Sequence, residues 1–352
     1  MTPDGDNLAA RLIEWLHIDS TSGREEEFLL HLEAFFESRG WRTRRQAVEE
    51  GRFNLICDLG QGQSDRQGPS LLYSTHVDTV PPFLPIRREG DRIFGRGACD
   101  TKGGLVAMVE AAEILRAEGH EDIGFLLVVG EEVDHCGAIK AAELELRPRR
   151  VVLCEPTENQ VVSAQKGMLR IGLRTKGVAG HSAFLDRGES AVEPLLDALQ
   201  TLRGAPYPMD EILGPTTLNI GIIEGGVAAN IFAPEARAEL LFRAVSPIGP
   251  LLSHVRDLVG EEVEIVDEVF NDPVFFDPPE GIETCTVPFN TDATYLKELG
   301  PVWLVGPGDI RVAHGDHEHI DLADLRAGVE LYVELGRRTL LGDGGVDNRP
   351  AS

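Results

Sequence analysis

The feature of the sequence that most constrains the fold is a set of short apolar runs that alternate with helical patterns. The runs cover residues 70–75 (SLLYST), 124–130 (GFLLVVG) and 150–154 (RVVLC), and each is typical of a strand buried on both faces. A helical pattern over 105–117 separates the first run from the second. Because strands that alternate with helices pack as a covered parallel sheet, we expect an α/β structure with a mostly parallel sheet.

Patterns near both ends of the chain extend this layer structure. Apolar residues at helical spacing predict helices over 8–17 and 22–38, and an extended stretch runs through 54–59. Near the C-terminus an apolar strand at 302–305 precedes a long helix over 322–340. We therefore expect the α/β domain to begin near the N-terminus and to resume near the C-terminus.

The pattern changes in the middle of the chain, after Lys166. Strands with alternating polarity and amphipathic helices follow in the order strand, helix, two strands, helix, strand; they cover 169–175, 191–202, 217–223, 236–245, 250–259 and 262–269. This is the order of a ferredoxin-like split βαβ unit, and its half-exposed strands suit an open-faced antiparallel sheet.

The domain boundaries follow from these patterns. We expect an α/β domain made of 1–166 and 273–341, interrupted by a smaller α+β insert at 167–272. The last residues, 342–352, are expected to form a loose tail.

Charge and cysteine content exclude several classes of function. The 352 residues include 59 acidic and 33 basic side chains, a net charge of −26, which disfavours binding to nucleic acid or to anionic membranes. We see no secretory signal and no apolar run of membrane-spanning length. The five cysteines are scattered without paired spacing, so we expect free thiols and a cytoplasmic location.

Histidine and carboxylate side chains stand at the ends of the predicted strands or in the Gly-rich loop 95–104 between them. These residues are His76, Asp78, Asp100, Glu131, Glu132, Glu155 and His314. In open α/β sheets, sites form beyond the carboxyl ends of the strands. We therefore expect these side chains to converge, although they are far apart in the sequence.

The types of these side chains favour a metal centre. Neutral imidazoles and carboxylates suit Zn²⁺, with Mn²⁺ or Co²⁺ as possible substitutes, and the set is large enough for two ions bridged by a carboxylate. His76 and Asp78 fall on one side of an extended chain, so Asp78 can accept the free N–H of His76. Glu131 and Glu132 point to opposite sides, so one can bind metal while the other acts as general base.

Each element of this pattern also has a structural interpretation. An isolated His-x-Asp is more often a loop hydrogen bond, and a Glu-Glu pair is usually solvated. The glycines around Asp100 fit ordinary turns, and they do not match a phosphate or dinucleotide loop. His317 and His319 look like exposed loop residues, although they could bind a metal together with His314. The joint occurrence at successive strand ends favours the metal centre.

Six sequence stretches carry a resemblance to a known family, in the order STHVDTVPP, GRGACDTKGG, GEE, CEPT, GHSA and AHGDHEHI. The chain resembles the acetylornithine deacetylase, succinyl-diaminopimelate desuccinylase and carboxypeptidase G family of co-catalytic zinc metallohydrolases. The resemblance runs from Ile18 to the C-terminal helix. It implies two zinc ions, held first by His76, Glu155 and the bridging Asp100, and second by Glu132, His314 and the same Asp100.

The resemblance also implies roles for residues that do not bind metal. Glu131 matches the general base, Asp78 matches the residue that steadies His76, and a cis peptide bond is implied between Asp100 and Thr101. In the insert, His181 matches a histidine that a partner subunit presents to the reacting carbonyl. The insert would then be a lid and dimerisation domain, and the protein a homodimer.

The resemblance also implies that Asn230 and Arg243 match insert residues with which members of the family bind a substrate carboxylate. Two departures from the family pattern, the compact segment 81–92 and the sequence Asn-Ile-Phe-Ala-Pro from Asn230, concern substrate fit more than chemistry.

Together these observations predict a dinuclear zinc amidohydrolase that removes the acyl group from a small N-acyl amino acid, with acetylornithine deacetylase as the nearest model. Within the family, the alternatives are release of lysine or ornithine from a carrier protein, succinyl-diaminopimelate hydrolysis, and dipeptide or carboxypeptidase cleavage. A non-catalytic metal-binding scaffold is disfavoured, because a scaffold needs no general base.

Overall fold

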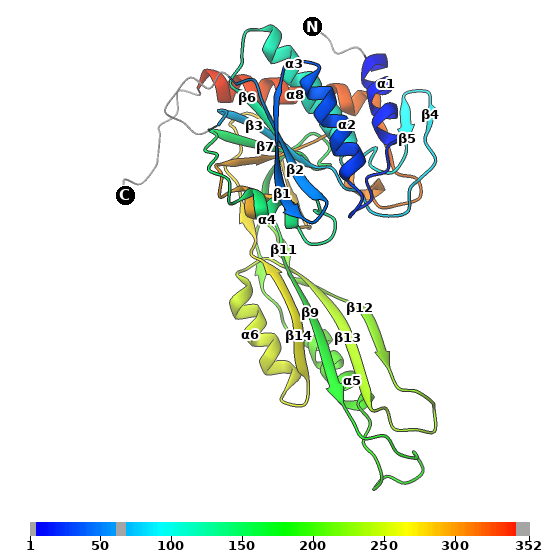
Figure 1. The fold of residues 1–352 in the computed structure, drawn as a ribbon. Coiled ribbons are helices and arrows are strands. Elements are labelled where there is room, and N and C mark those ends of the chain that lie inside the picture. The colour runs from blue at the N-terminus through cyan, green and yellow to red at the C-terminus, as the bar shows by residue number, and fades with distance from the viewer. Residues whose placement is uncertain (1–4, 61–67, 343–352) are drawn as a thin grey trace. The chain divides into compact units, whose positions relative to one another are not determined.

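The computed structural model describes residues 5–60 and 68–342 of the chain (Figure 1). The chain divides into two compact units. The first comprises Met1–Ser163, Phe276–Cys285 and Thr291–Ser352, and the second comprises Ala164–Phe275 and Thr286–Asn290. Of the predicted tail 342–352, only Gly342 belongs to the described residues.

A six-stranded sheet forms the centre of the first unit, with the strand order β1-β2-β6-β3-β7-β17. Its strands are β1 (Arg42–Glu49), β2 (Arg52–Asp58), β3 (Leu71–His76), β6 (Ile123–Val128), β7 (Arg150–Leu153) and β17 (Val302–Leu304). Strands β6, β3, β7 and β17 are parallel, whereas β1 and β2 add antiparallel pairs at one edge. The predicted α/β class with parallel strands is therefore confirmed, as a mixed sheet.

The helices of the first unit cover this sheet. They are α1 (Gly5–Leu16), α2 (Glu26–Glu37), α3 (Lys102–Ala117), α4 (Cys136–Ala141), α7 (Ala293–Leu296), α8 (Leu322–Leu341) and the short 3₁₀ helix η1 (Ile310–Val312). Helices α1, α3 and α8 contact one another, α2 packs on β1 and β2, and α4 contacts β1, β2, β6 and α7. The predicted helices over 8–17, 22–38, 105–117 and 322–340 correspond to α1, α2, α3 and α8.

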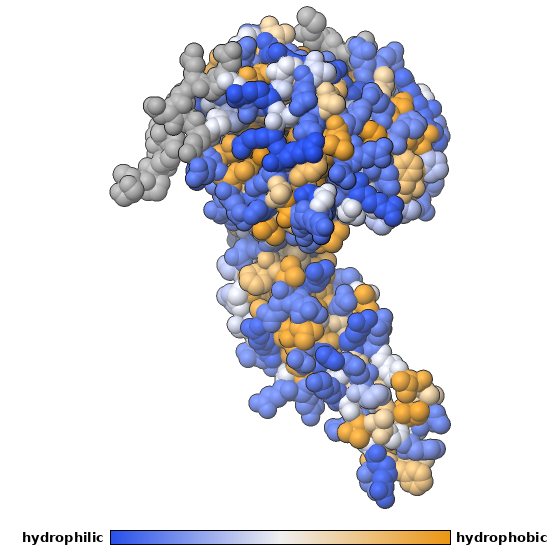
Figure 2. Space-filling view, in the orientation of Figure 1, coloured by the Kyte–Doolittle hydropathy of each residue, from blue (hydrophilic) through white to orange (hydrophobic). Residues whose placement is uncertain are grey.

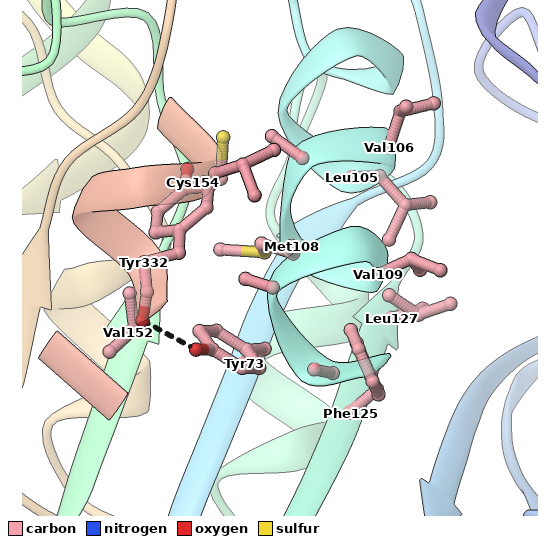
Figure 3. Packing of buried hydrophobic residues seen from close by; sticks show 14 of the residues in the cluster. Tyr73, Leu105, Val106, Met108, Val109, Phe125, Leu127, Val152, Cys154 and Tyr332 are labelled. Atoms are coloured by element: carbon pink, nitrogen blue, oxygen red, sulfur yellow. Dashed lines mark hydrogen bonds between the residues drawn. The ribbon is translucent and has the colours of Figure 1, made fainter. Parts of the chain in front are cut away.

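The main hydrophobic core lies between the sheet and helices α3 and α8 (Figure 3). Met108 points from α3 toward Tyr73 of β3 and Tyr332 of α8, and all three side chains are fully buried. The hydroxyl of Tyr73 donates a hydrogen bond to the backbone oxygen of Tyr332 at 2.7 Å, so the phenol is buried without losing its partner. Gly104 lets α3 approach β7, because a Cβ there would lie 2.0 Å from the sulfur of Cys154.

The second unit contains an antiparallel sheet with two helices. Its elements are β9 (Gly167–Lys176), α5 (Val192–Gly204), β12 (Thr217–Gly225), β13 (Glu235–Ala244), α6 (Ile248–Val259) and β14 (Glu264–Asn271), together with the small ribbon β10 (Met209–Asp210) and β11 (Gly214–Pro215). The strand order is β12-β13-β9-β14, every pair is antiparallel, and α5 and α6 contact each other and the sheet. Along β13 every second side chain is buried, as the alternating pattern predicts.

Two smaller sheets complete the fold. Strands β4 (Arg87–Glu89), β5 (Arg92–Phe94) and β18 (His319–Asp321) form one, and β8 (Val161–Gln165), β15 (Val274–Phe275) and β16 (Thr284–Val287) form the other. The amide of Phe276 donates a hydrogen bond to the carbonyl of Ser163 at 2.9 Å, so the chain leaves and re-enters the first unit at neighbouring residues.

The surface is largely hydrophilic in the view of Figure 2, with scattered apolar areas. One apolar group belongs to the loops of the second unit that follow β9 and β12; it consists of Val178, Phe184, Leu185, Val227 and Ile231. Within residues 5–60 and 68–342, no helix has the length and hydropathy needed to span a membrane.

Candidate metal centre and active site

Neighbouring parallel strands bring the predicted site residues of the first unit together at the carboxyl ends of the strands. His76 is the last residue of β3, and Glu131 and Glu155 follow β6 and β7, the two strands that flank β3. Asp100 lies two residues before the start of α3, and His314 lies after η1. These side chains therefore come together because parallel strands share the direction of their carboxyl ends.

Asp100 stands between the two predicted histidine ligands. Its Oδ1 is 3.1 Å from Nε2 of His76, and its Oδ2 is 3.4 Å from Nε2 of His314. The same nitrogen of His314 lies 3.0 Å from the carboxylate of Glu132. Two ligands bound tetrahedrally at about 2.0–2.1 Å from one zinc ion would lie about 3.3 Å apart, so these separations fit shared ions on both sides of Asp100.

Glu155 supplies an independent observation that fits a bound cation. Its side chain is buried and its Oε1 has no hydrogen-bond partner among the described residues. Burial raises the pKa of Glu155 well above its usual range, and the charges of Glu131 and Asp100 add to the increase. A buried carboxylate oxygen without a partner is costly, and a metal ion would remove that cost.

The pKa values of the histidines show how negative this pocket is. Hydrogen bonds to Asp100 and Glu132 raise the pKa of His314 to about 10. Burial lowers the pKa of His76, but Asp100, Asp78 and Glu155 outweigh burial and raise it well above its usual range. The pocket therefore attracts positive charge, and divalent ions would take the place of these protons.

The carboxylate of Asp78 makes the predicted contact with His76 at a longer distance than expected, and it makes further contacts. Nδ1 of His76 lies 2.9 Å from the backbone oxygen of Asp78 but 3.5 Å from its carboxylate, so the ring is held mainly by the backbone. The carboxylate of Asp78 accepts hydrogen bonds from the amides of Glu131 and Glu132, at 3.1 and 3.2 Å, and from the hydroxyl of Ser22 at 2.8 Å. Asp78 thus fixes the turn that carries the two glutamates.

Glu131 lies beside this cluster with an unusual pKa. Burial raises the pKa of Glu131 to about 8; the charges of His76 and His135 oppose the increase, and those of Asp292 and Glu132 add to it. Oε1 of Glu131 is 3.8 Å from Nδ1 of His135. A carboxylate with a pKa near neutrality can both accept and return a proton.

A buried ion pair holds the loop that carries Asp100. Oε1 of Glu318 accepts hydrogen bonds from the amides of Gly97, Cys99 and Asp100 at 2.9, 3.1 and 3.1 Å. Its Oε2 accepts a hydrogen bond from Nη1 of Arg96 at 2.6 Å, and Nη2 of Arg96 reaches the carbonyl of His314 at 3.5 Å. The pair therefore connects the backbones of two predicted ligands.

The peptide bond between Asp100 and Thr101 is cis, which confirms the expectation drawn from the family resemblance.

The two remaining histidines of the C-terminal loop do not join His314 in a three-histidine site. Nδ1 of His319 lies 2.7 Å from the carbonyl of His317, and the imidazole of His319 packs on the ring of Phe94. Among the described residues, His76, Asp100 and Glu132 have ligand-type atoms within 4.8 Å of one another, and neither His317 nor His319 joins this group. His314 alone turns toward the carboxylates.

The other predicted site residues belong to the second unit. His181 and Asn230 are exposed and lie on adjacent loops, where the amide of Ser182 donates a hydrogen bond to the carbonyl of Asn230 at 3.0 Å. Nδ1 of His181 accepts a hydrogen bond from the amide of Ala183 at 3.2 Å. Arg243 lies on β13, eight residues after Glu235 at the start of that strand, which corresponds to about 27 Å. The structure thus brings His181 and Asn230 together, apart from Arg243.

Three side chains near the site are not marked as functional by any pattern in the sequence. His135 and Asp292 meet across 157 residues, and no local pattern indicates such a pairing. Glu318 lies in the AHGDHEHI stretch, so its position was recognisable, but its contacts to backbone amides were not.

The fold and this cluster define a class. An α/β chain with two histidines and several buried carboxylates around a central aspartate has the donor set of a metal-dependent hydrolase. The family model for peptidase family M20/M25/M40 matches residues 72–338. The chain belongs to this family of metallopeptidases.

Curated relatives agree with this assignment. The chain is 35% identical over 345 residues to a peptidase M20 domain-containing protein of Schizosaccharomyces pombe, covering 95% of this chain and 85% of the relative. It is 34% identical over 364 residues to a probable carboxypeptidase of Aspergillus terreus, covering 91% and 83%.

Solved structures show the same fold. A tripeptidase from Staphylococcus aureus superposes with a TM-score of 0.81 at 23% identity, covering 95% of this chain and 98% of that one. A family M20 metallo-carboxypeptidase from Sulfolobus solfataricus gives 0.76 at 19% identity, covering 96% and 100%. A dinuclear metal-binding peptidase from Bacillus subtilis gives 0.68 at 14% identity, covering 96% and 98%.

Proposed function

We propose that this protein is a dinuclear zinc hydrolase that removes the acyl group from an N-acyl amino acid, in the manner of an acetylornithine deacetylase. The observation that carries the proposal is Asp100, whose two oxygens lie next to the nitrogens of His76 and His314. A carboxylate in this position can bridge two ions. Cobalt or manganese could take the place of zinc, because the same imidazole and carboxylate donors suit these ions.

Five residues would hold the ions. The first site would consist of His76, Glu155 and Asp100, and the second of Glu132, His314 and the same Asp100. When bound, the ions would polarise the scissile carbonyl and lower the pKa of a coordinated water to about 7.

Glu131 would act as the general base. It would accept a proton from the attacking water and donate it to the leaving amine, so the amide bond breaks with no net change in the protonation of Glu131. Asp78 would keep Glu131 in place through the hydrogen bond to its amide. In this way the backbone of the residue that delivers the proton is held in place.

The second unit would act as a ferredoxin-like lid and dimerisation domain. Its strand order and its exposed apolar loop residues support pairing with a second copy along the free edge of β12. His181 of one copy would then stabilise the oxyanion in the site of the other. Asn230 of that same copy and Arg243 of the other would bind the substrate carboxylate, because the two residues lie apart within one chain. We propose a cytoplasmic homodimer that acts on small molecules.

Peptide hydrolysis is the second candidate. It is favoured by the names of the relatives, several of which are probable carboxypeptidases. Two further candidate functions are the release of lysine or ornithine from a carrier protein and the hydrolysis of succinyl-diaminopimelate.

One release assay tests these functions together. Purified protein loaded with zinc is incubated with acetyl, succinyl and carbamoyl amino acids, dipeptides, and C-terminally blocked dipeptides, with and without a chelator. Chelator-sensitive release from an N-acyl amino acid supports the first proposal, and preference for dipeptides with a free C-terminus supports the second. Metal binding without any hydrolysis would favour a scaffold and would contradict both.

A further inference from the structure

A group of ionisable side chains lies beside Glu131. It consists of Glu131, His135 directly before α4, and Asp292 directly before α7. One ligand-type atom from each of the three residues lies within 4.8 Å of the others. All three belong to the first unit, and α4 and α7 are in contact.

His135 makes its hydrogen bond to Asp292 and not to Glu131. Its Nδ1 is 2.9 Å from Oδ1 of Asp292 and 3.8 Å from Oε1 of Glu131. With the carboxylate of Asp292 as the acceptor, the proton of this bond lies on Nδ1. The ring of Tyr295 packs against the imidazole, with centroids 5.5 Å apart, and limits its movement.

Asp292 is unusual because half of its hydrogen-bonding capacity is unused. Its side chain is 1% exposed, and Oδ2 has no partner among the described residues. A buried carboxylate in such a position is costly, so a role beyond stability is a reasonable explanation.

The charge of His135 agrees with this arrangement. Burial lowers the pKa of His135, but the hydrogen bond to Asp292 and the charges of Asp292 and Glu131 raise it to about 9. The imidazole is therefore a cation at neutral pH, located next to Glu131.

We propose that His135 and Asp292 form a positioning pair for Glu131. His135 places a positive charge beside the carboxylate, and Asp292 holds the N–H away from the oxygen that must receive the proton. Without Asp292, the nitrogen needs to move only about 1 Å to reach hydrogen-bond distance from Glu131. The imidazole would then occupy the acceptor oxygen, so Asp292 matters because it restrains His135. The proposal rests on the role of Glu131 in the proposed function.

A double-mutant series tests the proposal through kcat and KM on the best substrate of the release assay. We expect Asp292→Ala to lower kcat about 100-fold, since misplacement of a catalytic group by about 1 Å has that effect. We expect the double variant His135→Ala/Asp292→Ala to be about tenfold more active than Asp292→Ala, because the misplaced imidazole is gone. Asp292→Asn keeps an acceptor oxygen and should stay within a few-fold of wild type, and KM should change by less than about twofold throughout.

His31→Ala is the matched control, because it removes an imidazole that faces a carboxylate, that of Glu14, at 3.5 Å outside the site. Its kcat should equal that of wild type. Zinc content and melting temperature, measured for every variant, identify any that fail to fold. A double variant as slow as Asp292→Ala, with normal metal content, would overturn the proposal, and so would an Asp292→Asn variant as slow as Asp292→Ala.

A measurement without catalysis separates this proposal from the proposed function. The Nδ1–H proton of His135, observed by nuclear magnetic resonance in ¹⁵N-labelled protein, should keep its hydrogen-bonded shift in Glu131→Ala and lose it in Asp292→Ala. The reverse dependence would show that Glu131 holds the proton, and it would refute the positioning pair even if the enzyme hydrolyses amides.

Discussion

Replacement of Glu318 by Gln should destabilise the first unit strongly, although the change is nearly isosteric. The side chains of Glu318 and Arg96 are 0% and 2% exposed, and their ion pair has an N–O distance of 2.6 Å. The Gln oxygen can still accept the three backbone N–H groups, but its amide donor would face the guanidinium. Removing one partner of a buried pair costs about 3–5 kcal/mol, because the other charge is left uncompensated.

The size of this effect depends on burial and not on distance. Burial raises the pKa of Glu318, and Asp100 adds to the increase, so the intact pair contributes little net stability. Loss of one partner is nevertheless costly, since Arg96 cannot lose its charge. Glu334→Gln is the matched control: Glu334 also lies 2.6 Å from an arginine, Arg338, but the two side chains are 50% and 27% exposed. Its loss should cost less than about 1 kcal/mol.

Equilibrium unfolding in urea measures both variants. The chain has three tryptophans, Trp15, Trp41 and Trp303, and all lie in the first unit, so their fluorescence reports on that unit. The measurement is made with chelator, so that metal binding does not add to the free energy of unfolding. If the two variants differ by less than about 1 kcal/mol, burial does not control the strength of this pair, and the reasoning is refuted.

Three further predictions concern the metal centre and the assembly. Glu131→Gln should bind as much zinc as wild type by elemental analysis and lose roughly 100- to 10,000-fold in kcat, the contribution of a general base; a loss of under tenfold would show that another group has this role. Zinc titration of chelator-treated protein should give two ions per chain, and saturation at one ion would exclude a bridge at Asp100. Mixing inactive His181→Ala with inactive Glu131→Gln should restore up to half the activity per heterodimer, because one site then carries both defects and the other carries none; no recovery despite subunit exchange would exclude a site shared between subunits.

The sequence predicts the parts of the fold in which one physical signal dominates. The apolar runs at β3, β6 and β7 identify buried strands because each is shielded on both faces. The sequence does not predict strand β1, because an exposed edge strand with the sequence RTRRQAVE has no apolar alternation. The sequence also does not predict the short strands β4, β5, β15 and β16, since a run of two to four residues carries too little pattern.

The candidate site shows the same division. His76, Asp100 and His314 converge as expected, because strand ends and the loops behind them follow from topology. The sequence does not predict the hydrogen bonds from the amides of Glu131 and Glu132 to Asp78, since spacing in an extended chain says nothing about which backbone amides turn toward a carboxylate. The pairing of His135 with Asp292 depends on two short helices that meet only in the folded chain.

The hydrogen bond between Phe276 and Ser163 has a consequence for how the gene of this protein could evolve. The segment between these residues begins and ends at paired backbone positions, so its removal would leave a gap that one peptide turn can close. Insertions with adjacent ends add little loop-closure entropy to the host. A gene could therefore acquire, exchange or lose the intervening region in one event, and the host sheet would keep every strand it needs to fold.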